Sequence, residues 1–159
     1  MDLNYPSPQF PARPTIGLSL PDSFKPLISP SAIIGAVDTD SPEGFTSNII
    51  VICTRVIVDV TLDEMAADVR DKTVAEYPAA RASATEHFQI SGRDALATVL
   101  ALQPAGIDFE VEQFQTVVFV ATANDEIRDL LQIHATYALS VREHYAPLFH
   151  DAVRSMTVS

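Results

Sequence analysis

Residues 94–103 constrain the fold of this chain more than any other segment, because the segment is apolar on both of its sides. Its side chains form two alternating sets: Leu96, Leu100 and Leu102 on one side, and Ala95, Ala97, Val99 and Ala101 on the other. Successive side chains of a β-strand point to opposite faces of a sheet, so both faces of this sheet must be covered. The segment therefore predicts an interior strand with one layer of helix on each face.

The neighbouring strands are predicted from apolar and β-branched runs that end at turn residues. The tight turn Ser91-Gly92-Arg93 joins residues 82–90 to residues 94–103 as a hairpin, and two further short turns extend the hairpin into a meander. The predicted strands are 16–20, 32–37, 48–58, 82–90, 94–103, 107–122 and 127–137. The first of them ends at Pro21 and is expected at a sheet edge, followed by a turn over residues 21–26.

A first helix is predicted directly after the strand 48–58. Thr61 and Glu64 have the spacing of a capping box, in which each side chain accepts a hydrogen bond from the backbone N–H of the other residue. Apolar residues then recur every three or four positions until Pro78, which cannot continue the helix.

A second helix is predicted near the C-terminal end, from about Ser140 or His144 to Met156. Ser140 and Glu143 have the capping-box spacing, but Pro147 is expected to leave the first turn irregular and to begin the main helix. Strands, a helix, a meander and a helix follow one another in this order. The order predicts an α+β fold with a central antiparallel sheet of about six to seven strands and helices on both faces.

Acidic residues outnumber basic ones by 21 to 10, which gives a net charge of −11 in a chain of 159 residues. A surface of that sign repels phosphate backbones and anionic lipid head groups, so nucleic acid is not expected as a partner. The length predicts a single domain over residues 15–159, after an extended, proline-rich lead-in over residues 1–14. Neither a secretion signal nor a membrane span is recognisable in the sequence. We therefore expect a cytoplasmic protein, or a protein of the cell envelope if a targeting segment precedes this sequence.

The residues that are able to carry chemistry lack partners nearby in the sequence. Cys53 lies in an apolar run and is expected to behave as a small hydrophobic side chain. The histidines His87, His134, His144 and His150 do not have the spacing of a metal pair, and each is expected to be an ordinary imidazole. Phosphate loops, nucleophile elbows and zinc motifs are missing from the sequence. No catalytic residue, cofactor or metal site is therefore expected.

Asp108, Glu110 and Glu112 alternate with apolar residues in the predicted strand 107–122. Side chains two apart along a strand are separated by about 6.6–6.8 Å, too far to share a proton, so a solvated strand face is expected. After Gln113 apolar residues occupy that same face. This change predicts either a bulge or the passage of the strand under a helix.

Several motifs follow one another in an order that resembles a known family. They are Pro14-Thr15-Ile16-Gly17-Leu18-Ser19-Leu20-Pro21-Asp22-Ser23-Phe24, Phe45-Thr46-Ser47-Asn48-Ile49-Ile50-Val51, the capped helix, the Ser91-Gly92 hairpin and Gln113-Phe114-Gln115-Thr116-Val117-Val118. Over residues 14–156 the chain resembles the actinobacterial LpqN/LpqT lipoprotein family and, more broadly, PsbP-like sandwich domains. The resemblance implies an α/β/α sandwich that serves as an adaptor, chaperone or envelope ligand binder rather than as an enzyme. The chain departs from the family pattern in having Phe24 where a tryptophan is usual, and in lacking the lipoprotein signal.

Two functions from different classes fit these observations. The first is a non-catalytic binding or adaptor protein that receives a protein segment or a small amphiphilic ligand. Its tentative ligand crevice consists of Ala95, Ala97, Val99 and Ala101, although packing under the protein's own helix explains the same small residues. The alternative is a small hydrolase or isomerase whose His–carboxylate site is assembled by the fold. A cavity that holds His134 or His87 hydrogen-bonded to a carboxylate, with a strongly perturbed pKa, would favour the enzyme.

Overall fold

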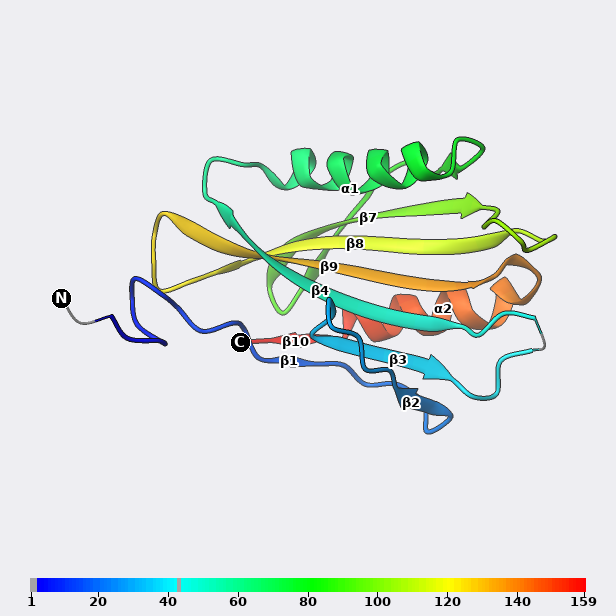
Figure 1. Ribbon diagram of the computed structural model, residues 1–159, viewed down its shortest axis with the longest axis horizontal. Helices are drawn as coiled ribbons and strands as arrows, with labels where there is room; N and C mark the ends of the chain where they lie inside the picture. The colour runs from blue at the N-terminus through cyan, green and yellow to red at the C-terminus, as the bar shows by residue number, and fades with distance from the viewer. Residues whose placement is uncertain (1–2, 43) are drawn as a thin grey trace.

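An eight-stranded antiparallel sheet forms the middle layer of the structure, a computed structural model that describes residues 3–42 and 44–159 (Figure 1). The order of its strands is β2-β3-β4-β9-β8-β7-β5, and β6 also pairs with β7. The elements are β2 (Phe24–Pro26), β3 (Ile34–Asp38), β4 (Asn48–Ile57), α1 (Leu62–Glu76), β5 (Arg81–Ala82), β6 (Glu86–Ile90), β7 (Arg93–Leu102), β8 (Val111–Ala121), β9 (Ile127–Ala138) and α2 (Arg142–Arg154). The α+β antiparallel sheet is confirmed. It has more strands than expected because the short strands β2 and β5 belong to it.

The two helices cover opposite faces of the sheet, as predicted (Figure 1). Val69 of α1 packs in one cluster with Leu96 of β7, whereas Phe149 of α2 packs in another cluster with Ala97 of the same strand. Adjacent residues of a strand point to opposite faces, so the two clusters lie on the two sides of the sheet. Strand β7 is interior, with β6 on one side and β8 on the other.

The hairpin before β7 has a tighter turn than the sequence predicted. Ile90 pairs with Arg93, which leaves two turn residues, Ser91 and Gly92, with φ values of 50° and 75°. Positive φ at both positions is the backbone of a type I′ turn, whose twist matches that of the flanking strands. This turn fixes the register of the meander.

The sheet has a bulge, but not in the predicted place. Strands β5 and β6 pair with β7 in registers that differ by one residue, so residues 83–85 oppose two residues of β7. Strand β8 instead pairs with β9 in one register from Val111 to Ala121. Of the two alternatives predicted for the change after Gln113, the bulge is therefore wrong and the passage under a helix is confirmed. The face of β8 becomes apolar there because it passes under α2, against which Phe114 packs.

The start of α1 is the predicted capping box. The Glu64 N–H donates to Thr61 Oγ1 over 3.2 Å, and the Thr61 N–H donates to Glu64 Oε2 over 2.8 Å. The hydrogen bonds from the backbone and side chain of Thr61 lower the pKa of Glu64. The helix ends at Glu76, just before Tyr77 and Pro78.

The second helix lies in the predicted region and follows an irregular turn, as predicted, but its cap and the place of Pro147 were predicted wrongly. The helix begins at Arg142, after the 3-10 turn Leu139–Val141, and its N-cap Val141 has no side-chain cap among the described residues. Pro147 lies inside the helix rather than at its start. The first turn persists because Tyr145 is buried and its hydroxyl donates to Asp38 over 2.8 Å. This packing outweighs the one helical hydrogen bond that the proline removes.

The N-terminal part of the fold also differs from the prediction. Only Ile16–Gly17 (β1) is strand within residues 16–20, and it pairs with Thr157–Val158 (β10) in a separate two-stranded sheet. A Cβ on Gly17 would lie 2.5 Å from Thr157 Oγ1, so a side chain at position 17 would force the Thr157 hydroxyl to move. The segment 21–26, expected as a turn, contains β2, which forms the edge of the main sheet.

Candidate functional site

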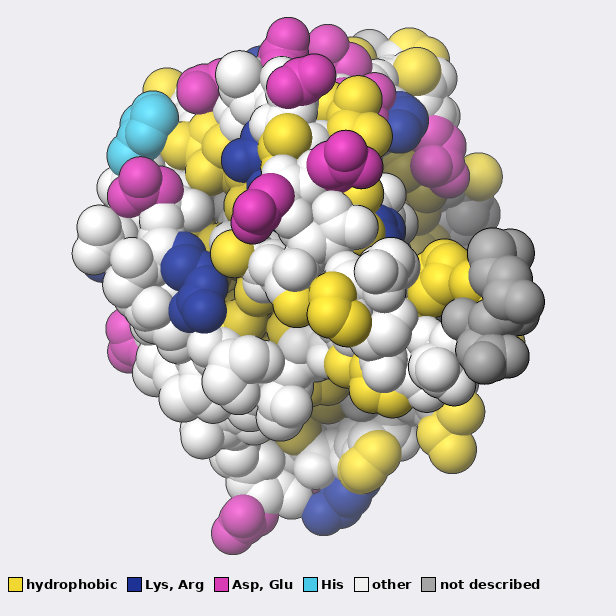
Figure 2. Space-filling view, turned by 90° about the vertical axis from the view of Figure 1, so that its left-hand side faces the viewer, with side chains coloured by type: hydrophobic (Ala, Val, Ile, Leu, Met, Phe, Trp, Pro, Cys, Tyr) yellow, Lys and Arg dark blue, Asp and Glu magenta, His cyan; other side chains and the backbone are white. Residues whose placement is uncertain are grey.

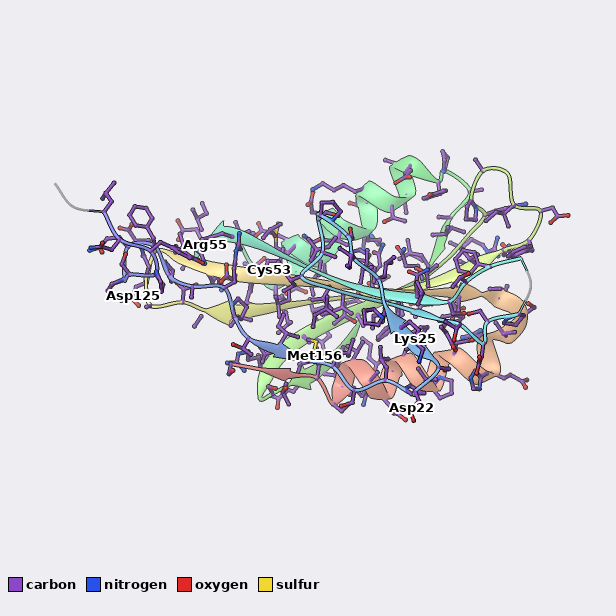
Figure 3. The ribbon with its side chains drawn as sticks, turned by 60° about the horizontal axis from the view of Figure 1, so that its bottom comes forward. Asp22, Lys25, Cys53, Arg55, Asp125 and Met156 are labelled. Carbon is purple, nitrogen blue, oxygen red and sulfur yellow. The ribbon has the colours of Figure 1, made fainter. Side chains whose placement is uncertain are left out.

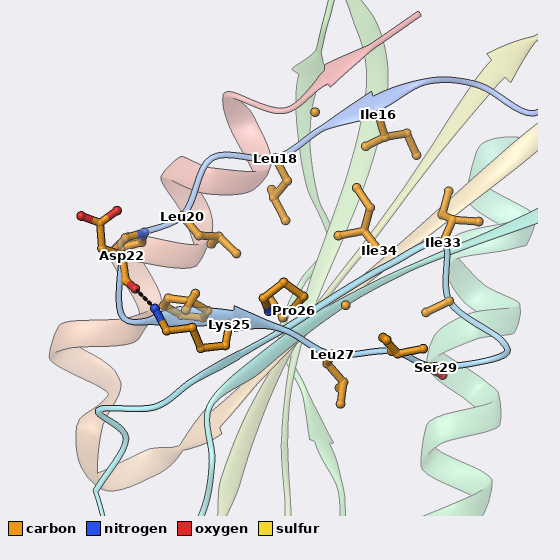
Figure 4. A pocket seen from close by; sticks show the side chains of 17 residues that line it. Ile16, Leu18, Leu20, Asp22, Lys25, Pro26, Leu27, Ser29, Ile33 and Ile34 are labelled. Atoms are coloured by element: carbon orange, nitrogen blue, oxygen red, sulfur yellow. Dashed lines mark hydrogen bonds between the residues drawn. The ribbon is translucent and has the colours of Figure 1, made fainter.

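A groove with a volume of about 930 Å³ runs between the N-terminal segment and the strands at the β2 edge (Figure 4). It is lined by residues 16–18, 20–22, 24–29 and 32–36, and we call it the β2–β3 groove. Figure 4 shows Leu18 and Leu20 on one side and Pro26 and Ile34 on the other. The groove has the size of typical small-molecule sites, which measure roughly 300–1,000 Å³.

The floor of the β2–β3 groove belongs to the core, whereas its rim exposes apolar side chains to solvent. Ile16, Leu18 and Ile34 are half-buried and pack against the core cluster under α2. Ile28 is 95% exposed and Ile33 is 44% exposed. Such contiguous exposed apolar surface marks interaction or ligand sites in soluble proteins.

A close backbone approach shapes the bend after β2. A Cβ on Gly35 would lie 2.5 Å from the carbonyl oxygen of Leu27, so a side chain at position 35 would push the two segments apart. The Leu27 N–H donates to the Gly35 carbonyl over 2.8 Å. The sequence therefore brings residues 27–29 close to β3 and leaves the apolar side chains of Leu27 and Ile28 at the groove.

The free edge of β2 offers few backbone donors to another strand. Pro26 has no N–H, and the N–H of Phe24 donates to the Pro21 carbonyl over 3.0 Å. Proline on an edge strand is one of the devices that prevent edge-to-edge pairing. The geometry thus favours a ligand that lies in the groove over a peptide that adds a strand.

A second cavity of about 510 Å³ adjoins the groove at Pro21, which lines both hollows. We call it the polar pocket. Its other lining residues are Ser23, Asp38, Asp40, Pro42, Val141, His144, Tyr145 and Leu148.

Asp38 is a buried carboxylate in the wall of the polar pocket. Its Oδ1 accepts from the Asp40 N–H over 3.0 Å, and its Oδ2 accepts from the Tyr145 hydroxyl over 2.8 Å. Burial acts to raise the pKa of Asp38, but these hydrogen bonds outweigh burial and lower it. Burial is also the main cause that raises the pKa of Tyr145. The pocket therefore keeps a fixed negative charge at neutral pH.

The four histidines have different surroundings. His87 is exposed on β6, and His144 lines the polar pocket. His134 lies on the opposite face from the buried side chains that flank it, and burial lowers its pKa to about 4. His150 lies 3.3 Å from Glu86, measured from Nε2 to Oε2.

The start of β8 separates the three alternating carboxylates Asp108, Glu110 and Glu112. Asp108 and Glu110 precede the strand, and Glu110 pairs with Arg81. Glu112 is buried, and its Oε1 accepts a hydrogen bond from the Tyr137 hydroxyl. The prediction of a solvated face was thus wrong for Glu112, because the beginning of α2 covers it.

The four residues of the tentative crevice along β7 do not share one cavity. Ala95 and Ala97 are buried in the core cluster under α2, while Ala101 is half-buried. Val99 lines a cavity of about 290 Å³ together with His150 and other residues. A ligand site at these four residues stays a prediction.

Cys53 has neighbours that its sequence environment did not reveal. Arg13 Nη1 lies 3.4 Å from Cys53 Sγ and 3.0 Å from Asp129 Oδ1, which ties the lead-in to the sheet. Burial and then the charge of Asp129 raise the pKa of the Cys53 thiol. Cys53 and Arg55 lie toward the opposite end of the sheet from Asp22 and Lys25 (Figure 3).

The end of the molecule that carries the lead-in has exposed apolar side chains of its own. They are Leu3, Tyr5, Phe10, Ile57 and Val58. On this face hydrophobic side chains are scattered among acidic and basic ones (Figure 2). Over residues 3–42 and 44–159, no His, Cys, Asp and Glu side chains form a group of three or more able to hold a metal ion. None of the helices in those ranges is long and apolar enough to cross a membrane.

No protein-family model matches the chain, and no curated protein matches it in sequence. Solved structures do share its fold. LpqN of Mycobacterium tuberculosis, described as involved in cell envelope biogenesis, is 18% identical over 94% of this chain and 86% of its own, with a TM-score of 0.75. CyanoP, the PsbP of Synechocystis sp. PCC 6803, is 15% identical over 92% of each chain, with a TM-score of 0.59. PA94 of Pseudomonas aeruginosa, a protein of unknown function described as a putative regulator, is 13% identical over 90% of this chain and 95% of its own, with a TM-score of 0.62.

None of these three descriptions names an enzymatic activity. Identities this low show the fold alone. The fold implied by the order of the sequence motifs is confirmed, and the chain has the α+β sandwich fold of LpqN and PsbP.

Proposed function

We propose that this protein is a non-catalytic binding protein that holds the alkyl chain of an amphiphile in the β2–β3 groove. The observation that carries the proposal is the exposure of Ile28 and Ile33 at the rim of a groove whose floor is already apolar. Solvent-exposed isoleucines contribute little to folding stability, but they are available to a ligand. The proline at the β2 edge supports a lipid-like ligand over a strand-adding peptide.

The expected affinity is moderate. Burial of a twelve-carbon chain yields about 10 kcal/mol at about 0.8 kcal/mol per methylene. Association and ordering cost roughly 4 kcal/mol or more. A Kd of about 0.1 mM or weaker is therefore expected from burial of the alkyl chain alone. The likeness to LpqN, a protein involved in cell envelope biogenesis, supports an envelope amphiphile as the ligand and the envelope as the location.

The test is a titration of the ¹⁵N-labelled protein with dodecyl maltoside below its micelle concentration. Amide signals of residues 16–36 should shift, and the double variant Ile28→Ser/Ile33→Ser should weaken binding by about tenfold. The matched control Ile57→Ser/Val58→Ser removes two exposed apolar side chains at the other end and should leave the Kd within about twofold. Equal losses in the two variants, or no binding to the wild type, would refute the proposal.

The alternative, a small hydrolase or isomerase, is favoured by one observation. The fold places His150 against Glu86, beside the cavity that Glu112 and Tyr137 also line. However, Glu86 also pairs with Arg154, and the His150–Glu86 pair is partly exposed rather than enclosed. A panel of ester and keto substrates tests this alternative: turnover that the change His150→Gln abolishes would replace the binding proposal.

A further inference from the structure

We propose that the ligand carries a positively charged head group, which the polar pocket receives while the alkyl chain lies in the β2–β3 groove. This inference rests on the proposed function, because it describes the second half of the same ligand. It narrows the substrate class to single-chain amphiphiles with a cationic head.

The two hollows adjoin at one short segment. Pro21 lines both of them, Asp22 and Phe24 line the groove, and Ser23 lines the pocket. Asp22 and Leu20 lie at the end of the groove nearest α2, the helix that supplies the other wall of the pocket (Figure 4). An amphiphile in the groove would therefore reach the pocket with one end.

The charge of the lining residues changes where the β2–β3 groove meets the polar pocket. The charged residues of the groove are Asp22 and Lys25, and Lys25 Nζ donates to the Asp22 backbone carbonyl over 2.8 Å. The pocket adds Asp38 and Asp40, and α2 contributes His144 to it. Three carboxylates and one ammonium group thus line the two hollows, which leaves a net negative charge when the histidine is neutral.

The two aspartates of the pocket have different roles. Both oxygens of the buried Asp38 already accept hydrogen bonds from Asp40 and Tyr145, so Asp38 supplies a fixed negative potential in the wall. Asp40 is exposed, and its carboxylate has no hydrogen-bond or ion-pair partner among residues 3–42 and 44–159, so it can approach a head group. A cation in the pocket would complement both charges, whereas an anionic head would be repelled by them.

The experiment uses three probes with the same dodecyl chain and different head groups. Dodecyltrimethylammonium, dodecyl maltoside and dodecyl sulfate are titrated below their micelle concentrations at pH 8, where histidine side chains are generally neutral. We expect the cationic probe to bind about tenfold more tightly than the neutral one and the anionic probe to bind most weakly. Added salt should reduce this difference.

Two matched variants test whether the preference for a cationic head group arises in the polar pocket. Asp40→Asn should weaken binding of the cationic probe by about three- to tenfold and weaken that of dodecyl maltoside clearly less, because the maltoside head carries no charge. Asp125→Asn removes the same charge from an exposed turn at the other end of the molecule (Figure 3) and should change neither.

The outcomes separate the two proposals. If no probe binds, or if Ile28→Ser/Ile33→Ser binds all three as tightly as the wild type, the proposed function fails and this inference fails with it. If the three probes bind the groove equally, or if Asp125→Asn weakens the cationic probe as much as Asp40→Asn does, the head-group inference is overturned and the binding function stands.

Discussion

The two halves of the sheet are built differently. Strands β7, β8 and β9 have 10, 11 and 12 residues, pair in long unbroken registers and bury most of their side chains. The edge half has β2 and β3, with three and five residues, and β2 exposes two of its three residues. Apolar side chains in the first half are needed for stability, whereas several in the second half are presented to solvent. We therefore expect substitutions of buried residues in the meander half to lower stability, and substitutions of the exposed apolar residues in the edge half to change only binding.

The largest effect is expected from Phe149→Ala, because this side chain joins the two halves. Phe149 is fully buried, and its ring centroid lies 5.8 Å from that of Phe24 in β2 and 5.8 Å from that of Tyr137 in β9. Removal of the ring should lower the free energy of unfolding by about 3–5 kcal/mol. Urea denaturation measures this change, and a loss below about 1 kcal/mol would contradict the packing that we describe.

A smaller, pH-dependent effect is expected from Tyr145→Phe. The change removes one of the donors to the buried Asp38 carboxylate and should cost about 1.5–3 kcal/mol at pH 7. The pKa of Asp38 is lowered in the folded protein, so the stabilisation is complete above the unfolded pKa and is lost as the pH falls through the folded pKa. The difference between variant and wild type should therefore shrink towards pH 3.

Urea melts at pH 7 and pH 3 check this dependence, with Tyr5→Phe as the control. Tyr5 is 68% exposed, so its hydroxyl should matter at neither pH. A cost for Tyr145→Phe that is the same at both pH values would mean that the charge on Asp38 plays no part.

Thr61→Ala tests a helix start that was predictable from the sequence. It removes the acceptor for the Glu64 N–H and should cost about 1 kcal/mol. Ser140→Ala is the matched control, since Ser140 has the same capping-box spacing but lies in a 3-10 turn and caps nothing. It should change the unfolding free energy by less than about 0.5 kcal/mol. Equal losses from the two changes would show that the cap has no special role.

The meander was predictable because its determinants are local: a turn that favours positive φ, alternating apolar residues and short connections. The edge half was not, because β2 contains Pro26 and follows Pro21, which locally indicate a turn. Its pairing with β3 depends on tertiary packing. The polar pocket was equally hidden, since Asp38 and Tyr145 are separated by 107 positions. Only the apolar residues around the bend after β2 gave a signal in the sequence, and they resemble ordinary core residues.

The smallest effect on stability, and the sharpest test of the comparison, is expected from Ile28→Ser. Ile28 is 95% exposed, so its side chain buries almost no apolar surface on folding, and the unfolding free energy should change by less than about 0.5 kcal/mol. Within the groove the same change should weaken binding of dodecyl maltoside, because the ligand loses an apolar wall. Thermal melts and titrations on one preparation measure both quantities. A destabilised variant would mean that the rim belongs to the core, and a stable variant with unchanged binding would mean that the ligand lies elsewhere.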